Sequence, residues 1–387
     1  MLIVADLLAT ARRRSGLTDF GSMAFEEGLG ILVDAINTEA GLDPVIERRV
    51  QENLVGLLEN RLRMQRDLAS HPEILDETIL PPVFITSLPR TGSTKLHRML
   101  GATGDFHAMR YWQGLNFAPF RAGDEADPAN DPRIAAAAAD LEWQRSRSPL
   151  FFEAHPMFVD DGEEERLLLN AGFNSLYDHA SYMNVPSYAQ WVLSIDPLQA
   201  FKDMRRILQY LQWQFHRGVA RRWILKTPAL LGMEGALAAA FPGMDFIVTH
   251  RHPAAIMGSV CALLTGIRQV YRGREGRDDD VGAFLLTNFG TTVDLHLDWR
   301  ERYPAEKVLD IAFDRIVRDE VGTLGEVYRF LKLPLTDAAK RNVEAWVDMD
   351  ARRRGTPRSF TLQEYGLDAA HVNERFARYI HRYATFL

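Results

Sequence analysis

Apolar residues recur at helical spacing toward both ends of the chain. Between Pro44 and Ser70 the apolar positions return every third or fourth residue, with arginine and glutamate between them, which predicts one amphipathic helix. The stretch 2–11 also predicts a helix, and its arginines follow the apolar residues instead of preceding them as in a secretory signal. The final segment predicts a docked amphipathic helix whose apolar face consists of Val372, Phe376, Tyr379, Ile380 and Tyr383.

The central part of the chain alternates between short β-rich runs and helical patterns. The runs lie at 83–86, 223–226, 246–250 and 308–312, and helical stretches such as 235–241 and 254–264 separate them. This alternation predicts an α/β fold with a mainly parallel central sheet and helices on both faces. The polar segment 271–280, YRGREGRDDD, is predicted to be an exposed loop and is a candidate lid.

These patterns divide the chain into three predicted parts. Residues 1–80 form a helical N-terminal segment, 81–335 an α/β core, and 336–387 a helical C-terminal extension packed on that core. The length is sufficient for a large hydrophobic core.

Composition indicates an ordinary globular protein and narrows its partners. The chain has 387 residues, 47% of them hydrophobic, and a net charge of −7, which argues against a general nucleic-acid surface and requires any phosphate site to be local. Its single cysteine, Cys261, cannot form an intrachain disulfide, so we expect a cytoplasmic location. No run of 18 uncharged apolar residues occurs, so no membrane span is expected. Whether the chain forms a homo-oligomer stays open.

The first segment that carries chemistry follows the predicted strand 83–86. A glycine-containing turn leads there into a helical pattern, an arrangement whose backbone N–H groups and helix dipole favour an anion. The nucleoside triphosphate pattern GxxxxGK(S/T) does not fit, because Ser87 stands where it needs glycine and Ser93 where it needs lysine.

Two further segments end predicted strands with cationic side chains. Arg251 directly follows the run 246–250 and precedes His252 and Pro253, with Ser259 eight residues after Arg251 in a helical stretch. An arginine and a hydroxyl group together can recognise a phosphate monoester by charge-assisted hydrogen bonds. Between this segment and the first, Lys226 ends another run, followed by threonine and proline.

In this order the three segments resemble the motifs of the sulfotransferases that use 3′-phosphoadenosine 5′-phosphosulfate (PAPS). The family's 5′-phosphosulfate loop has the approximate pattern P-(K/R)-(S/T)-G-(S/T)-T, which residues 89–94 match, and the resemblance extends over 81–333. It implies a P-loop-like sulfotransferase fold. The implied donor-binding residues are Arg90, Thr91, Gly92, Ser93, Thr94 and the adjacent Lys95 for the phosphosulfate, and Arg251 and Ser259 for the 3′-phosphate. Lys226 resembles the family's strand lysine and is, with Arg90, implied in catalysis.

The sequence departs from the cytosolic members of this family at several positions. Pro228 stands where those enzymes carry a basic histidine, and Lys95 stands where a tryptophan stacks on adenine. Their C-terminal R-K-G loop, which grips the 3′-phosphate, is only loosely matched by Arg353, Arg354 and Gly355, for which an exposed basic turn is the alternative.

The acidic segment 155–173 is the predicted source of the general base. Bacterial members of the family often show a His-Pro and an acidic pair in such a stretch, so His155 and Glu164 are the candidates. We prefer Glu164, because the apolar run 167–169 that follows could bury it and raise its basicity. The alternative is a solvated acidic helix start.

We therefore predict a sulfotransferase that moves the sulfuryl group of PAPS to the hydroxyl group of a small acceptor, in line and without a metal ion. An apolar or aromatic acceptor is expected on two grounds. The acidic chain would repel polyanionic acceptors. An aromatic cluster, which is either core or the lining of an acceptor pocket, consists of Tyr111, Trp112, Phe117 and Phe120. Two alternatives stay open: a nucleotide-dependent kinase-like enzyme, and a catalytically silent relative that binds the product 3′-phosphoadenosine 5′-phosphate (PAP).

Overall fold

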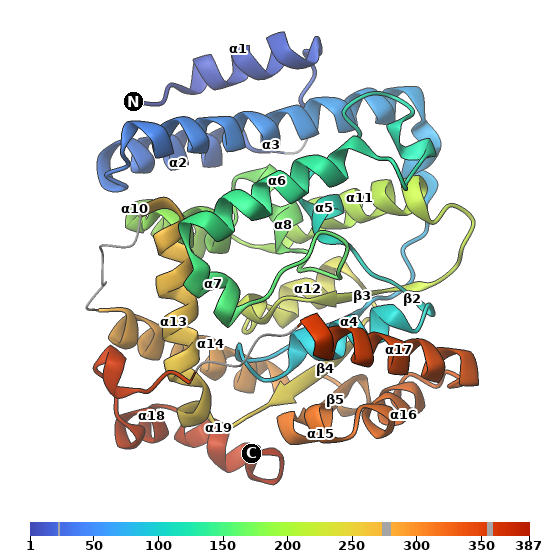
Figure 1. The fold of residues 1–387 in the computed structure, drawn as a ribbon, viewed down its shortest axis with the longest axis vertical. Coiled ribbons are helices and arrows are strands. Elements are labelled where there is room, and N and C mark those ends of the chain that lie inside the picture. The colour runs from blue at the N-terminus through green and yellow to red at the C-terminus, as the bar shows by residue number, and fades with distance from the viewer. Residues whose placement is uncertain (22–23, 273–279, 354–358) are drawn as a thin grey trace.

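The computed structural model in Figure 1 describes residues 1–21, 24–272, 280–353 and 359–387. Among these residues one five-stranded sheet occurs, in the order β2-β3-β1-β4-β5, and every pair of neighbouring strands is parallel. The strands are β1 (Val83–Thr86), β2 (Phe106–His107), β3 (Arg222–Lys226), β4 (Asp245–His250) and β5 (Val308–Ala312). The predicted α/β fold and the four predicted strands are confirmed. The edge strand β2 was not predicted, because two residues carry no periodicity.

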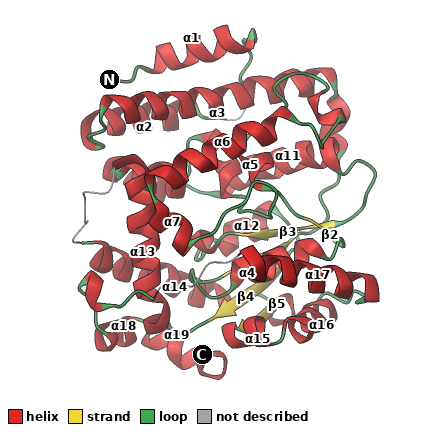
Figure 2. Ribbon diagram, in the orientation of Figure 1, coloured by secondary structure: helices red, strands yellow, loops and turns green. Residues whose placement is uncertain are grey.

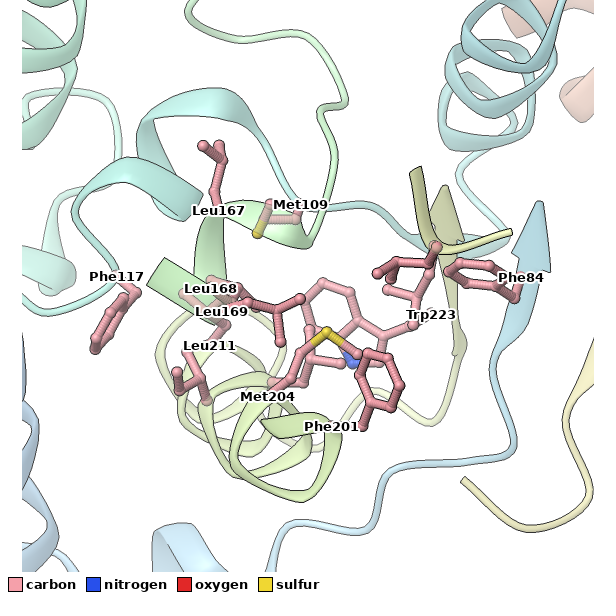
Figure 3. Close-up of a cluster of buried hydrophobic side chains, with 14 of the residues drawn as sticks. Phe84, Met109, Phe117, Leu167, Leu168, Leu169, Phe201, Met204, Leu211 and Trp223 are labelled. Carbon is pink, nitrogen blue, oxygen red and sulfur yellow. The ribbon is translucent and has the colours of Figure 1, made fainter. Parts of the chain in front are cut away.

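The two faces of the sheet are covered by different helices, as Figure 2 shows. Successive strand residues point to opposite faces. Phe84 of β1 accordingly packs in the cluster that includes α11 (Leu198–Phe215) and α12 (Glu234–Ala240). Its neighbours Val83 and Ile85 pack in the cluster that includes α4 (Ser93–Ala102) and α16 (Glu320–Phe330). Figure 3 shows the first cluster, which contains Trp223 of β3 and Met204 of α11.

Helices make up most of the rest of the chain. The N-terminal ones are α1 (Val4–Ser15), α2 (Glu26–Glu39) and α3 (Pro44–Ser70). Those between β1 and β3 are α4 (Ser93–Ala102), α5 (Tyr111–Leu115), α6 (Pro132–Arg147), α7 (Pro149–Ala154), α8 (Arg166–Leu169), α9 (Ser181–Met183), α10 (Pro186–Ser194) and α11 (Leu198–Phe215). Those after β3 are α12 (Glu234–Ala240), α13 (Pro253–Arg272), α14 (Val281–Arg300), α15 (Phe313–Arg318), α16 (Glu320–Phe330), α17 (Asp337–Arg353), α18 (Ala369–Arg375) and α19 (Ala377–Arg382). Short 3₁₀ helices lie at η1 (Pro72–Asp76), η2 (Asp124–Ala126), η3 (Asn170–Gly172), η5 (Pro228–Leu230), η6 (Ala305–Lys307), η7 (Gln363–Tyr365) and η8 (Ala384–Phe386), and η4 (Leu176–Ala180) is a π-helix.

The N-terminal helices form a layer at the end of the molecule away from the sheet (Figure 1). Helix α3 has the bounds that its periodicity predicts, because Asp43 caps it by accepting hydrogen bonds from the backbone of Val45 and Ile46, and Pro44 occupies its first position. Its apolar stripe packs against α1 and α2 and reaches residues of the central segment such as Phe173 and Tyr188. The N-terminal layer therefore shares a core with the middle of the chain.

The predicted C-terminal helix is in fact two short helices, α18 and α19, with the break at Phe376. The predicted apolar face is nonetheless docked, since Val372, Phe376, Tyr379 and Tyr383 are buried against α13 and α14. The predicted loop 271–280 is wrong at its start, because Tyr271 and Arg272 end α13. Residues 273–279 lie outside the described residues.

Helix α13 alone among the described residues is long and apolar enough to cross a membrane. In this fold 56% of that stretch is buried, and α13 packs against α7, α9 and α14. The core helix of a soluble protein meets the same length and composition criteria, so the observation is weak support for a span.

Candidate active site

The loop between β1 and α4 turns sharply at the carboxyl end of the central strand. Arg90 and Gly92 have positive φ angles of 70° and 86°. A Cβ atom at Gly92 would also lie 3.2 Å from the ring of Phe313, so the position favours glycine on two grounds. Thr91 fixes the turn by donating to the carbonyl of Leu88 at 2.9 Å and by bonding the Thr249 hydroxyl at 2.7 Å.

Helix α4 begins directly after this turn. Its N-cap residue Gly92 offers no side-chain cap, so the backbone N–H groups of the first turn, from Ser93 to Lys95, have no intrahelical acceptor. Such an N-terminus attracts an anion through these donors and through the helix dipole. The Lys95 ammonium itself turns aside and pairs with Glu320 on α16 at 2.5 Å. If Lys95 contacts a ligand, its backbone is the part that is suitably placed.

The structure brings the first and last predicted phosphate motifs into contact. The Arg90 Nε donates to the Ser259 hydroxyl of α13 at 3.1 Å, and the Arg251 guanidinium donates to the carbonyl oxygen of Arg90 at 3.3 Å. The contact follows from topology, because β1 and β4 are parallel neighbours whose carboxyl ends meet at one edge of the sheet. The Arg251 guanidinium also lies over the ring of Phe313, 4.1 Å from its centroid.

Lys226 enters the same edge from the other neighbour of β1. It ends β3, and its ammonium donates to the Thr94 hydroxyl at 3.3 Å and to Glu164 Oε1 at 2.6 Å. The Lys226 side chain is buried. One buried cation thus connects the loop with the acidic segment, which comes from a different part of the chain.

The three consecutive glutamates of the acidic segment have different partners. Glu163 faces His155 and the Arg98 guanidinium of α4, Glu164 faces Lys226, and Glu165 accepts a hydrogen bond from the backbone N–H of Lys226 at 2.8 Å. Arg98 further holds the segment through the carbonyl oxygens of Pro156 and Gly162. The alternative of a solvated helix start is therefore wrong: Glu163 and Glu165 are buried, and α8 begins only at Arg166.

The electrostatics of the candidate base differ from the expectation. Burial disfavours the ionised form of Glu164, but the Lys226 ammonium and the Arg166 guanidinium outweigh it and hold the pKa of Glu164 below its ordinary value. The predicted reason for choosing Glu164, an apolar setting that raises its pKa, is thus wrong, since its surroundings are cationic. Burial instead raises the pKa of Glu165 to about 7.

His155, the other candidate, lies on the far side of Glu163. Its Nε2 is 3.8 Å from Glu163 Oε1, and burial lowers the pKa of His155 despite that carboxylate. Burial likewise opposes ionisation of Glu163, but His155 and Lys226 hold the pKa of Glu163 well below its ordinary value. Ligand atoms of His155, Glu163 and Glu164 lie within 4.8 Å of one another, a grouping that could hold a metal ion, although Lys226 and Arg98 already balance its charge.

Other predicted site residues lie elsewhere. Arg353 donates to Asp161 at 3.2 Å and lies over the ring of Phe158, so its described contacts are with the acidic segment. Arg354 and Gly355 lie outside the described residues. Of the predicted aromatic cluster, Tyr111, Trp112 and Phe117 are buried in the core, whereas Phe120 is half-buried beneath the Arg63 guanidinium.

A comparison with known families decides the identity of the fold. The model of the sulfotransferase family matches residues 81–337. The chain belongs to the sulfotransferase family. Sulfotransferase STF1 from Mycobacterium tuberculosis H37Rv is 29% identical, with a TM-score of 0.81 over 97% of this chain and 99% of that one. Sulfotransferase STF9 from Mycobacterium avium shares the fold, with 24% identity and a TM-score of 0.82 over 99% and 97% of the two chains. No curated protein matches the sequence significantly.

The sequence did not identify every residue of the candidate site. Arg98 and Arg166 both bind carboxylates of the acidic segment, and Glu165 supports the end of β3. Arg98 looked like an ordinary helix residue, and only the fold shows that its face of α4 meets the segment. Glu165 gave a usable signal, because it lies two residues before a buried apolar run.

Proposed function

We propose that this sulfotransferase uses PAPS as its donor and transfers the sulfuryl group to the hydroxyl group of a small, uncharged acceptor. The contact between Arg90 and Ser259 carries the proposal, because it joins a helix N-terminus suited to one phosphate group with a cationic strand end suited to another. The cations of both strand ends lie within reach of this contact, Arg251 on one side and Lys226 on the other.

The residues present fit the two anionic ends of PAPS. The first-turn N–H groups of α4, with Arg90, Thr94 and Lys226, would hold the phosphosulfate, and Arg251 and Ser259 would hold the 3′-phosphate. A neutral ligand would gain little from so many donors. This fit favours PAPS over a ligand with a single charged group.

In the proposed reaction the acceptor oxygen forms a bond to sulfur while the bond between sulfur and the bridging oxygen of the 5′-phosphate breaks. The electron pair of the broken bond leaves with PAP, and the hydroxyl proton passes to Glu164. Lys226 and Arg90 stabilise the negative charge that grows on the bridging oxygen and the sulfuryl oxygens. Glu164 is the proposed base because it touches Lys226, and position comes before pKa in selecting a base. His155 would act through Glu163 as a positioning residue.

Two other functions are separable by ligand binding. A kinase-like enzyme would bind ATP with magnesium, and a silent relative would bind PAP without transferring sulfate. We expect the chain to be cytoplasmic, in keeping with its buried free thiol at Cys261.

The test compares PAP, ATP with magnesium, and NAD as stabilising ligands, followed by transfer from radiolabelled PAPS to a panel of phenols and alcohols. PAP at about 100 times its dissociation constant should stabilise the protein by about 2.7 kcal/mol, and NAD should not. Stabilisation by ATP with magnesium and none by PAP would contradict the proposal. PAP binding without transfer to any acceptor would identify a silent relative.

A further inference from the structure

A cavity of about 280 Å³ lies between the N-terminal helix α3 and the segment that follows the acidic loop. Arg49, Asn53 and Gly56 line it from α3, and Arg166, Asp178 and Tyr182 line it from the other side. A dry cavity of about 150 Å³ is large enough for benzene, so this cavity has room for roughly two fused rings.

The cavity adjoins the proposed base through one side chain. Arg166 lines the cavity, and its Nε donates to Glu164 Oε2 at 2.7 Å. The other oxygen of Glu164 accepts from Lys226, which in turn donates to Thr94 of the loop. A continuous series of contacts therefore connects the cavity with the proposed donor site.

The charged groups of the cavity wall already have charged partners. Arg49 binds Asp140, and Arg166 binds both Asp178 and Glu164. Glu52 also lines the cavity and pairs with Arg14, which lies outside the lining, so each of the three lining carboxylates already has a guanidinium partner. An anionic ligand would therefore lose its hydration without gaining a cationic partner, because both guanidinium groups of the lining are committed to carboxylates.

The remaining wall is suited to a ring. Leu54, Leu57 and Leu167 contribute apolar surface, and the rings of Tyr182 and Tyr271 meet edge to face with centroids 5.2 Å apart. His179 adds no positive charge near neutrality, because burial lowers the pKa of this residue to about 4.

We propose that this cavity binds the acceptor, and that the acceptor is an uncharged hydroxyl compound with a body of about two fused rings. The inference rests on the proposed function. It adds where the acceptor binds, and it excludes anionic acceptors. Helix α3 lies outside the residues that the family model matches, so this wall belongs to a part of the chain that the family motifs do not specify.

The test uses 2-naphthol and 6-hydroxy-2-naphthoate, which share the ring body and the hydroxyl group and differ in one carboxylate. Equilibrium binding of each is followed by naphthol fluorescence in the presence of PAP. The wild-type protein should bind 2-naphthol at least about tenfold more tightly than the naphthoate, because the carboxylate would be desolvated without a cationic partner in the wall.

Gly56→Leu tests the location of the site. A Cβ atom at Gly56 would meet no atom within 4 Å, so a leucine there extends into open space beside the cavity without a backbone clash, and leucine favours the helix. Gly325→Leu is the matched control, because Gly325 is also a helical glycine with open space, on α16 and away from the cavity lining. We expect Gly56→Leu to weaken 2-naphthol binding about tenfold or more, and both variants to bind PAP as the wild type does.

Glu52→Lys tests the charge argument at an exposed residue. This substitution removes the partner of Arg14 and adds a cation to the lining, so it should strengthen naphthoate binding several-fold relative to 2-naphthol binding. Unchanged 2-naphthol binding in Gly56→Leu, or equal binding of the two probes to the wild type, would overturn the inference. If the wild-type protein does not bind PAP, the proposed function is overturned instead, so failure of the inference and failure of the proposed function are distinguishable.

Discussion

Replacing Glu165 with glutamine should change how the stability of this sulfotransferase depends on pH. Glu165 is 1% exposed, and burial raises the pKa of its carboxyl group to about 7 from an ordinary value of 4.5. Because the folded-state pKa is the higher one, the folded protein binds more protons than the unfolded chain between these values. The contribution of Glu165 to stability is therefore full below pH 4.5 and is lost as the pH rises toward 7.

The size of the effect follows from the two pKa values. Relative to a group that does not titrate, ionisation of Glu165 costs about 0.8 kcal/mol of folding stability at pH 5 and about 3.3 kcal/mol at pH 8. Glutamine has no such cost, and its side-chain oxygen can still accept the hydrogen bond from the Lys226 backbone. The stability of Glu165→Gln relative to wild type should thus rise by about 2.5 kcal/mol from pH 5 to pH 8.

Urea unfolding of both proteins at pH 5, 6, 7 and 8, followed by tryptophan fluorescence, measures this difference. Glu163→Gln is the matched control, because the pKa of Glu163 is held well below its ordinary value and its contribution is already present at pH 5. That variant should be destabilised by a nearly constant amount over the same range. If the difference between Glu165→Gln and wild type does not change with pH, Glu165 is ionised in the folded protein at every pH tested and the reasoning is refuted.

Three further predictions concern the donor and the base. Arg251→Ala should weaken PAP binding in titration calorimetry much more than binding of adenosine 5′-phosphate, which lacks the 3′-phosphate; equal losses would make Arg251 a structural residue. Lys226→Ala should lower kcat by on the order of 10²-fold or more and PAP affinity far less, and a kcat within a few-fold of wild type would exclude its catalytic role. Glu164→Gln should lower kcat by about 10² to 10⁴ at all pH values. The kcat of the wild type should stay constant from pH 8 down into the carboxyl range, because the pKa of Glu164 is lowered. A near-normal kcat in Glu164→Gln together with an inactive His155→Asn would reverse the assignment.

The parts of the fold that the sequence predicted well are those with a strong local signal. Helix α3 combines a long apolar stripe with an Asp-Pro start, and β1 is a fully buried run between a proline pair and a turn. The break between α18 and α19 at Phe376 was not visible in the sequence, because the apolar face continues across it and only the backbone changes direction. The membership of the family was predictable from the three motifs, since each lies at the carboxyl end of a strand in the sheet.

The electrostatics of the site could not be predicted from the sequence, because they depend on which residues meet across the fold. The sequence placed Glu164 beside three leucines, whereas the fold places its carboxylate between Lys226 and Arg166. Lys226 lies 62 residues away along the chain, so no local pattern could reveal the pairing. The direction of the pKa shift was wrong for this reason.

The divergence between Glu164 and Glu165 follows from the two ways in which one lysine meets them. Lys226 offers its ammonium to Glu164 and its backbone N–H to Glu165. A full positive charge compensates the burial of a carboxylate, whereas a single backbone dipole does not, so neighbours of the same type acquire pKa values on opposite sides of the ordinary one. The hydrogen bond from the Lys226 backbone N–H to the Glu165 carboxylate fixes the end of β3, and with it the position of the Lys226 Cα atom. If Glu164 takes the proton in sulfuryl transfer, Glu165 serves the same reaction by holding the lysine that faces both the base and the loop.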